Sequence, residues 1–237
     1  MTTEPTVSVV VTHWNHTKLL RAALDSLTAQ TVPPAEVIIV DDGTEDAPSV
    51  SAVIASCPVR PIVVYLPHRG IGSALNTAVS IMRANVLCWL PADDLWMPNK
   101  LERQREFAER HSDCVLHSFC EVWENDSYAR PGIVPELTDE EMAVAIRHSS
   151  PYYANTFWIP KDILDRVGKF REDVIASEDY EWVLRSVVLH GVKYRLQPEM
   201  LTVKRRHAET TTVRHSEEVI RLVQQFNDEV GSTCKLH

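Results

Sequence analysis

Two pairs of adjacent aspartates each follow an apolar run. Asp41 and Asp42 occur in VDDG, and Asp93 and Asp94 occur in WLPADDLWMPNKL. Adjacent carboxylates raise each other's pKa and cost stability unless a cation or hydrogen-bond donors compensate them. Mg²⁺ and Mn²⁺ prefer such oxygen ligands and combine them with substrate phosphates. A single pair is more typical of a turn or a helix cap, but two pairs at strand ends favour a metal and phosphate site.

A third acidic group lies in SEDYEW, where Glu178 and Asp179 open a helix-like pattern. The helix dipole alone favours acids in a first helical turn, so a functional role requires one of them to face the same site as the aspartate pairs. In that position it would act as a general base on an acceptor hydroxyl.

Two further segments carry groups that could meet phosphate. The basic stretch KRRHAETTT, residues 204–212, is more often a solvated loop, yet its Arg and His side chains suit phosphate or a shared metal. The segment RGIGSAL, residues 69–75, has Leu75 where a dinucleotide-binding fingerprint requires its third glycine. We interpret this second segment as a glycine turn before a helix.

Four near-continuous apolar runs predict the strands that position these residues. Runs of this kind are typical of strands covered on both faces. They are VSVVV (7–11), EVIIV (36–40), PIVVY (61–65) and NVLCWL (85–90). Apolar residues at helical spacing follow the first and third runs. The alternation predicts an α/β fold with a mainly parallel sheet flanked by helices, whose carboxyl edge gathers residues 12–15 and both aspartate pairs.

The second half of the chain predicts a mixed α+β arrangement. A capping box at Thr138 and Glu141 starts one helix, residues 155–159 resemble a strand, and a further helix carries Trp182 and Val187. We expect 124–139 to form a long surface loop and 216–230 to form a closing amphipathic helix. Because no repeat or low-complexity linker divides the chain, residues 1–237 are expected to form one domain.

Composition narrows the class of protein. The 237 residues are 44% hydrophobic and carry a formal net charge of -9, which argues against a nucleic-acid partner. The five cysteines are scattered and form no CxxC pair, so a reducing, cytoplasmic location fits best. No signal peptide and no transmembrane segment are expected. Peripheral membrane association and the oligomeric state stay open.

In order and spacing, these motifs resemble the family 2 glycosyltransferases, which are inverting nucleotide-sugar enzymes of the Rossmann-like GT-A fold. The resemblance covers about residues 6–212. It rests on VSVVVTHWN, EVIIVDDGTED, GIGSALNTAV, WLPADDLWMPNKL, VGKFREDVIASEDYEWVLR and VKRRHAETTT. It implies that residues 6–112 form the nucleotide-sugar-binding half, 113–215 the acceptor-side half, and 216–237 a C-terminal helix and tail.

The resemblance also implies roles for individual residues. Thr12 and Trp14 would border the nucleoside, and Asp42, with Asp41 as a second choice, would accept a hydrogen bond from the base, commonly uracil. Arg69 and Glu178 are further expected substrate-binding residues. Asp93 would lie near the ribose and diphosphate or join the metal. Asp94 or Asp93 would ligate Mn²⁺ or Mg²⁺ with His207 as an additional ligand, and Asp179 would be the catalytic base.

Three positions depart from the family pattern. Pro91 stands where an acid is frequent, His68 stands where an asparagine is usual, and Thr12 replaces a common proline. These departures leave the later aspartates for the metal and weaken any assignment of the donor.

The expected activity is the metal-dependent transfer of a sugar from a nucleotide-diphosphate sugar, with UDP the favoured nucleotide, to a carbohydrate or glycoconjugate hydroxyl with inversion. One alternative is a catalytically degenerate domain that binds nucleotide sugars or glycans. A less favoured one is a sugar nucleotidyltransferase, for which the N-terminal region lacks a glycine-rich phosphate loop.

Overall fold

A five-stranded sheet forms the centre of the protein in the computed structural model, which describes residues 4–208, 210 and 216–234. The strands are β1 (Val7–His13), β2 (Glu36–Asp41), β3 (Ile62–Tyr65), β4 (Val86–Pro91) and β8 (Ile159–Pro160), in the order β3-β2-β1-β4-β8. The first four are mutually parallel and β8 runs antiparallel to β4. All four predicted strands are confirmed. Only β3 is not covered on both faces, because it is the outermost strand, and Ile62 and Tyr65 are exposed.

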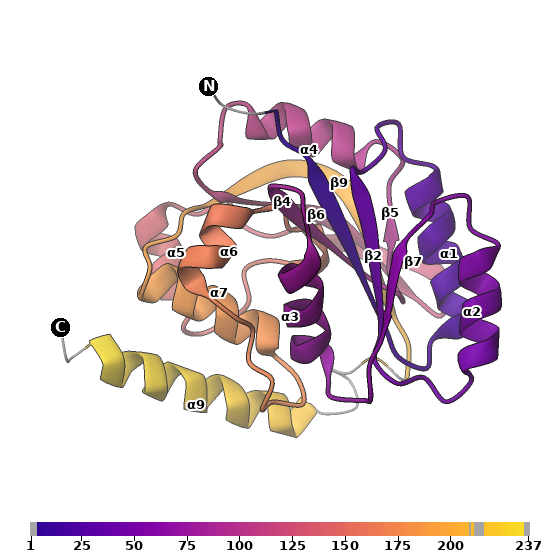
Figure 1. Ribbon diagram of the computed structural model, residues 1–237. Coiled ribbons are helices and arrows are strands. Elements are labelled where there is room, and N and C mark those ends of the chain that lie inside the picture. Colours follow the sequence, from indigo (N-terminus) through magenta and orange to yellow (C-terminus); the bar gives the residue numbers. More distant parts are fainter. Residues whose placement is uncertain (1–3, 209, 211–215, 235–237) are drawn as a thin grey trace.

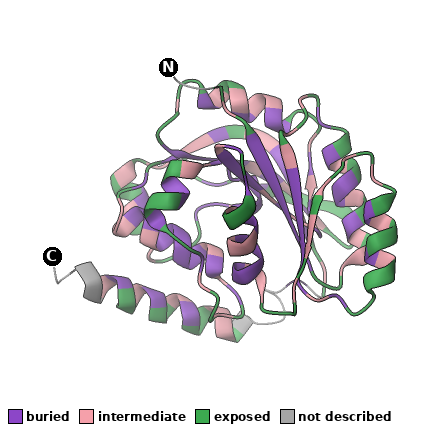
Figure 2. Ribbon diagram, viewed as in Figure 1, coloured by how far each residue is buried: buried purple, intermediate pink, exposed green. Residues whose placement is uncertain are grey.

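Helices cover both faces of this sheet (Figure 1). Successive side chains of β1 point in opposite directions, so Val9 and Val11 pack into one core cluster and Val10 into the other. The first cluster includes residues of α1 (Thr17–Thr28), α2 (Ala47–Ala55) and α4 (Lys100–Ala108). The second includes residues of α3 (Ile71–Ile81), α6 (Lys161–Val167) and α7 (Glu178–Val188). Figure 2 shows the strands as the most continuously buried part of the molecule.

A second sheet of four strands brings the C-terminal part of the chain to the first sheet. Its order is β5-β9-β6-β7, with β5 (Leu95–Trp96), β9 (Tyr194–Arg206), β6 (Val115–Glu124) and β7 (Ser127–Gly132). Two expectations are corrected here. Residues 127–132 form a strand rather than a surface loop, and 204–206 belong to β9. Positions 209, 211 and 212 of the basic stretch lie outside the described residues.

The remaining helices lie in the second half of the chain. They are α5 (Asp139–Ala145), the 3₁₀ helix η1 (Ala154–Thr156) and α9 (Ser216–Cys234). The predicted capping box of α5 is confirmed, because Thr138 and Glu141 each bond the other's backbone N–H. The strand predicted at 155–159 is wrong for most of its length, since 154–156 are helical. The amphipathic helix α9 packs beside α7 and buries Leu222 and Phe226 (Figure 1).

No helix in the described part of the chain is long and apolar enough to cross a membrane. Cys57, Cys88, Cys114 and Cys120 are free thiols.

Candidate functional site

The carboxyl ends of β1, β2 and β4 meet at one edge of the first sheet. His13 lies opposite Asp41 in the register of β1 and β2, and Thr12 lies opposite Pro91 in that of β1 and β4. The backbone N–H of Asp42 donates to the His13 carbonyl at 2.8 Å. The turns after the three strands are therefore joined to one another, and both aspartate pairs lie at this edge as the sequence predicts.

Asp41 is buried and makes its contacts inside the protein. Its carboxylate lies 2.9 Å from His13 Nδ1 and accepts a hydrogen bond from the Thr44 hydroxyl at 2.5 Å. Burial lowers the pKa of His13, although its contact with Asp41 opposes that effect. With these partners Asp41 holds the turn in place, and we do not retain it as a residue that contacts the base.

Asp42 is bound by the turn that precedes α3. One carboxylate oxygen accepts from the Arg69 backbone N–H, and the other contacts the Gly70 N–H and His68 Nδ1, each at 2.8 Å. Gly43 is required beside this turn, because its φ is +79° and a Cβ there would lie 2.6 Å from the backbone nitrogen of His68. Arg69 thus contacts Asp42 through its backbone N–H. Asp42 Oδ1 accepts only this one of the three hydrogen bonds, so one of its lone pairs is not used by them.

Trp14 and His68 form a flat aromatic surface next to Asp42. Their rings stack with centroids 4.1 Å apart and planes inclined by 11°. Trp14 is 36% exposed, so the pair offers a face on which a planar ring can stack. Thr12, by contrast, is buried, and its hydroxyl accepts a hydrogen bond from Trp89 Nε1 at 2.9 Å. Sequence reasoning treated His68 only as a departure, whereas the structure gives it contacts with both Trp14 and Asp42.

Asp93 lies in a cluster of three side chains that could hold a metal ion. His207 Nε2 is 3.3 Å from the Asp93 carboxylate, and the His207 and His16 rings meet edge to face with centroids 5.0 Å apart. Ligand atoms of all three residues lie within 4.8 Å of one another. Burial would raise the pKa of Asp93, but the hydrogen bond from His207 and the nearby positive charges lower it. The same hydrogen bond raises the pKa of His207.

Asp94 points elsewhere although it follows Asp93 directly. Its two carboxylate oxygens accept hydrogen bonds from the Arg205 backbone N–H at 2.9 Å and from Asn155 Nδ2 at 2.8 Å. Burial, and secondarily the charge of Asp93, raise its pKa to about 7. Asp94 therefore connects the end of β4 to η1 and β9, and we no longer include it among the proposed metal ligands.

Arg205 completes this connection and was not recognised from the sequence. Its guanidinium donates to the Asp93 carbonyl, and also to the Leu19 carbonyl at 3.2 Å. A buried guanidinium with several acceptors fixes the backbone around it. The end of β9, which His207 follows directly, is thereby fixed against the Asp93 turn and α1.

Glu178 and Asp179 occupy the start of α7. Ser177 precedes them in the left-handed region with φ 65°, and Asp179 accepts a hydrogen bond from the Tyr180 N–H at 2.8 Å. Asp179 also lines a cavity of about 10 Å³ with otherwise apolar walls that include Trp89 and Trp182. Burial raises the pKa of Asp179, and burial together with the Asp179 charge raises the pKa of Glu178 to about 8.

Lys204 links the two acidic groups electrostatically. It lies on β9 next to Arg205, and its positive charge lowers the pKa of four carboxyls of the site. These carboxyls belong to Asp93, Asp94, Glu178 and Asp179. Burial would lower the pKa of Lys204, yet the surrounding carboxylates raise it. Lys204 therefore stays positively charged within electrostatic reach of both Asp93 and Asp179.

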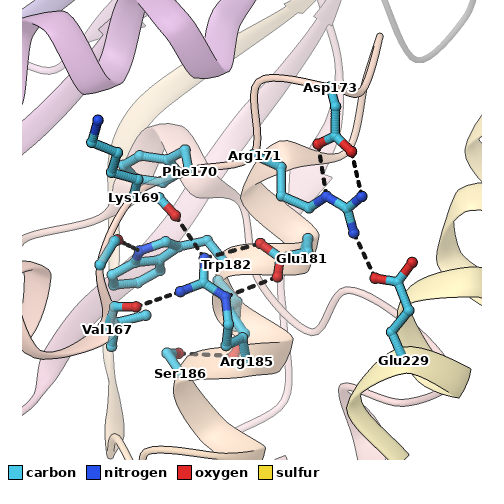
Figure 3. A network of polar contacts seen from close by, with 12 residues as sticks. Val167, Lys169, Phe170, Arg171, Asp173, Glu181, Trp182, Arg185, Ser186 and Glu229 are labelled. Carbon is cyan, nitrogen blue, oxygen red and sulfur yellow. Dashed lines mark hydrogen bonds and ion pairs between the residues drawn. The ribbon is translucent and has the colours of Figure 1, made fainter. Parts of the chain in front are cut away.

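A polar network supports α7 behind the site (Figure 3). Arg185 pairs with Glu181 at 2.8 Å and donates to the Val167 and Lys169 carbonyls. Arg171, in the segment before α7, contacts Asp173 and Glu229, the latter on α9. The Arg185 contacts therefore tie α7 to the end of α6 and the chain that follows it, and the Arg171 contacts tie the segment before α7 to α9.

Comparisons with known proteins agree on the family. The family model described as Glycosyl transferase family 2 matches residues 8–171. An uncharacterized glycosyltransferase of Rickettsia prowazekii (strain Madrid E) is 27% identical over 88% of this chain and 66% of its own length. A longer one from Rickettsia felis (strain ATCC VR-1525 / URRWXCal2) is 25% identical over 95% of this chain. The chain spans about two thirds of the first relative and 37% of the second.

Two solved structures share the fold. S. aureus TarS 1-349 in complex with UDP-GlcNAc has a TM-score of 0.72 at 19% identity, covering 97% of this chain and 71% of that 1-349 chain. The mannosyltransferase PcManGT from Pyrobaculum calidifontis, in complex with GDP-Man and Mn²⁺, has a TM-score of 0.70 at 19% identity, covering 97% and 65%. The α/β architecture is thus the GT-A fold. The chain belongs to glycosyltransferase family 2.

Proposed function

We propose that this chain transfers the sugar of a nucleotide-diphosphate sugar to an acceptor hydroxyl, with inversion at the anomeric carbon. The observation that carries the proposal is that Asp93, which contacts His207, and Asp179 both lie close enough to Lys204 for its charge to lower their pKa. A cation site for a leaving diphosphate and a carboxylate base for an acceptor are the two groups that this reaction needs. The nucleotide-sugar complexes of TarS and PcManGT support the donor class.

The base of the donor would stack on Trp14 and His68. Asp42 supports this assignment, because one oxygen beside the stacked pair retains a lone pair that can accept from a base N–H. Uracil offers such a donor at N3, and the family resemblance together with the UDP-GlcNAc complex of TarS is the ground on which we favour a UDP-sugar.

The diphosphate would lie at Asp93 and His207, which can hold a divalent cation with its remaining positions open to phosphate oxygens. The chemistry of this donor set fits a divalent cation, because both carboxylate oxygen and imidazole nitrogen are ligands of Mn²⁺-type ions. When bound, the cation would neutralise charge on the departing diphosphate. Lys204 adds a fixed positive charge from the protein itself.

Asp179 would take the proton of the acceptor hydroxyl. The acceptor oxygen forms the new bond to the anomeric carbon while the bond from that carbon to the diphosphate oxygen breaks. The electron pair leaves with the nucleoside diphosphate, so direct displacement inverts the centre without an enzyme nucleophile. Burial raises the pKa of Asp179, which makes its carboxylate a stronger base toward the acceptor hydroxyl.

A panel of nucleotide sugars tests the proposal. With Mn²⁺ present, we expect one donor class to release nucleoside diphosphate, to stabilise the protein thermally, and to lose both effects when EDTA is added. Thermal stabilisation with no product from any donor or acceptor, in contrast, would identify a binding domain and contradict the transfer activity.

The variant Asp179→Asn tests the base. We expect transfer to fall by about 10²- to 10⁴-fold, because an amide cannot accept the proton. Nucleotide binding, measured by calorimetry, should persist, since Asp179 is assigned to the acceptor. Asp165→Asn, an exposed carboxylate on α6, is the matched control. Undiminished turnover in Asp179→Asn would remove Asp179 from the mechanism.

A further inference from the structure

His16 lies against the two proposed ligands but comes from a different part of the chain. It precedes α1, whereas Asp93 follows β4 and His207 follows β9. One ligand atom from each residue falls within a common span of 4.8 Å. All three side chains are half-buried, so they are neither enclosed in the core nor isolated in solvent.

The backbone fixes the position of His16 independently of its side chain. Its carbonyl accepts hydrogen bonds from the N–H groups of Leu19 and Leu20 at 2.8 and 2.9 Å, which begins α1. The imidazole makes no capping hydrogen bond to the helix. A substitution at position 16 therefore changes the cluster while leaving the start of α1 intact.

Asp93 supplies the only carboxylate of the cluster among the described residues. Asp94 is turned toward Asn155 and Arg205, with both oxygens hydrogen-bonded. The described residues thus contribute two imidazole nitrogens and one carboxylate oxygen. Mg²⁺ prefers oxygen ligands in near-ideal octahedral geometry, whereas Mn²⁺ and the later first-row divalent ions accept imidazole more readily.

We propose that His16 is a third protein ligand of the cation, and that the resulting set of two histidines and Asp93 selects Mn²⁺ over Mg²⁺. This inference rests on the proposed function, because it concerns the cation of the same site. It assigns the selectivity to a residue outside the aspartate motif, and the three protein ligands leave positions for diphosphate oxygens.

Mn²⁺ bound in the presence of UDP, or of GDP if UDP does not bind, is the probe. Pulsed electron paramagnetic resonance counts the ¹⁴N nuclei coupled to Mn²⁺, and the free Mn²⁺ signal gives the affinity. We expect two histidine couplings in the wild type and one in His16→Gln, with affinity lowered at least about tenfold. His148→Gln, which changes an exposed histidine after α5, should match the wild type. A thermal melt verifies that each variant is folded.

His16→Asp tests the selectivity. Exchanging a nitrogen ligand for an oxygen should lower the ratio of Mn²⁺ to Mg²⁺ affinity while Mn²⁺ still binds. The inference is overturned if His16→Gln keeps the wild-type couplings and affinity, or if His16→Asp leaves the ratio unchanged. These readouts need no turnover. Two histidine ¹⁴N couplings to Mn²⁺ in a protein that transfers no sugar would contradict only the proposed function. Sugar transfer by a protein with a single histidine coupling would contradict only this inference.

Discussion

The two aspartate pairs occupy the same edge of the sheet but are held in different ways. Asp41 and Asp42 bond to groups from residues 13–70, all within the first half of the chain. Asp93 and Asp94 bond to Asn155, Arg205 and His207, which lie 61 to 114 positions later in the chain. The proposed base-binding end is thus assembled locally, whereas the proposed metal-binding end exists only when strand β9 has docked.

The pairs also divide their work differently. In the first pair, the interior residue Asp41 stabilises a turn and Asp42 shapes the surface beside Trp14. In the second pair, Asp93 faces the two histidines and Asp94 anchors the turn. Two neighbouring carboxylates therefore need not share a ligand, since successive side chains leave the backbone in different directions.

The largest expected effect is a loss of transfer activity on substitution of Asp93, which substitution of Asp42 should not cause to the same extent. Asp93→Asn should reduce transfer by about a thousandfold, because a bound cation contributes several kcal/mol to stabilising the leaving group. Mn²⁺ binding should be lost as well. Asp42→Asn should keep Mn²⁺ binding and raise the KM of the donor by about tenfold, the value of one charged hydrogen bond. Steady-state kinetics and Mn²⁺ titration measure these effects in the two variants. Loss of Mn²⁺ binding in Asp42→Asn would contradict the assignment of the cation to Asp93 and not to Asp42.

The next largest expected effect concerns the contribution of Asp94 to the stability of the fold. Asp94→Ala removes the acceptors of two buried donors, the Arg205 N–H and Asn155 Nδ2, and should lower the free energy of unfolding by about 3 kcal/mol. Urea titration measures this, with the exposed Asp25→Ala as control. If Asp94 contributed mainly as a metal ligand, Asp94→Ala would instead leave the metal-free stability unchanged.

The smallest expected effect concerns pH. Lys204 lowers the pKa of Asp179, so Lys204→Met should raise that pKa further. A base works only when ionised, and the acidic limb of the kcat/KM profile should therefore move to higher pH. Lys204→Arg should keep the wild-type limb, and Lys18→Met, at an exposed position of α1, serves as control. An unmoved limb in Lys204→Met would show that its charge does not act on the base.

Hydrophobic patterning predicted the nucleotide-side half well. The runs that became β1, β2 and β4 are buried, and burial is the property that such patterns report. β7 was missed because five of its six residues are exposed and it pairs only at the edge of the second sheet. The end of β9 was assigned to a loop, since its lysine and arginines reflect the site rather than the core.

The sequence predicted which residues belong to the site better than it predicted how they are arranged. The sequence placed Asp93, His207 and Asp179 near one edge through the family resemblance. It could not assign different environments to Asp93 and Asp94, because that depends on β9 and η1 docking from distant positions. His16 carries no local signal, and Lys204 was singled out only as part of a basic stretch, since only tertiary contact brings either residue to the carboxylates.

Anomalous diffraction at the manganese edge, from crystals of the chain grown with UDP and Mn²⁺, tests the central claim most directly. We expect one peak at bonding distance from the Asp93 carboxylate and His207, next to the nucleotide diphosphate and separate from Asp94. A peak bonded to Asp94 in place of Asp93, or bound UDP with no manganese peak, would contradict the account.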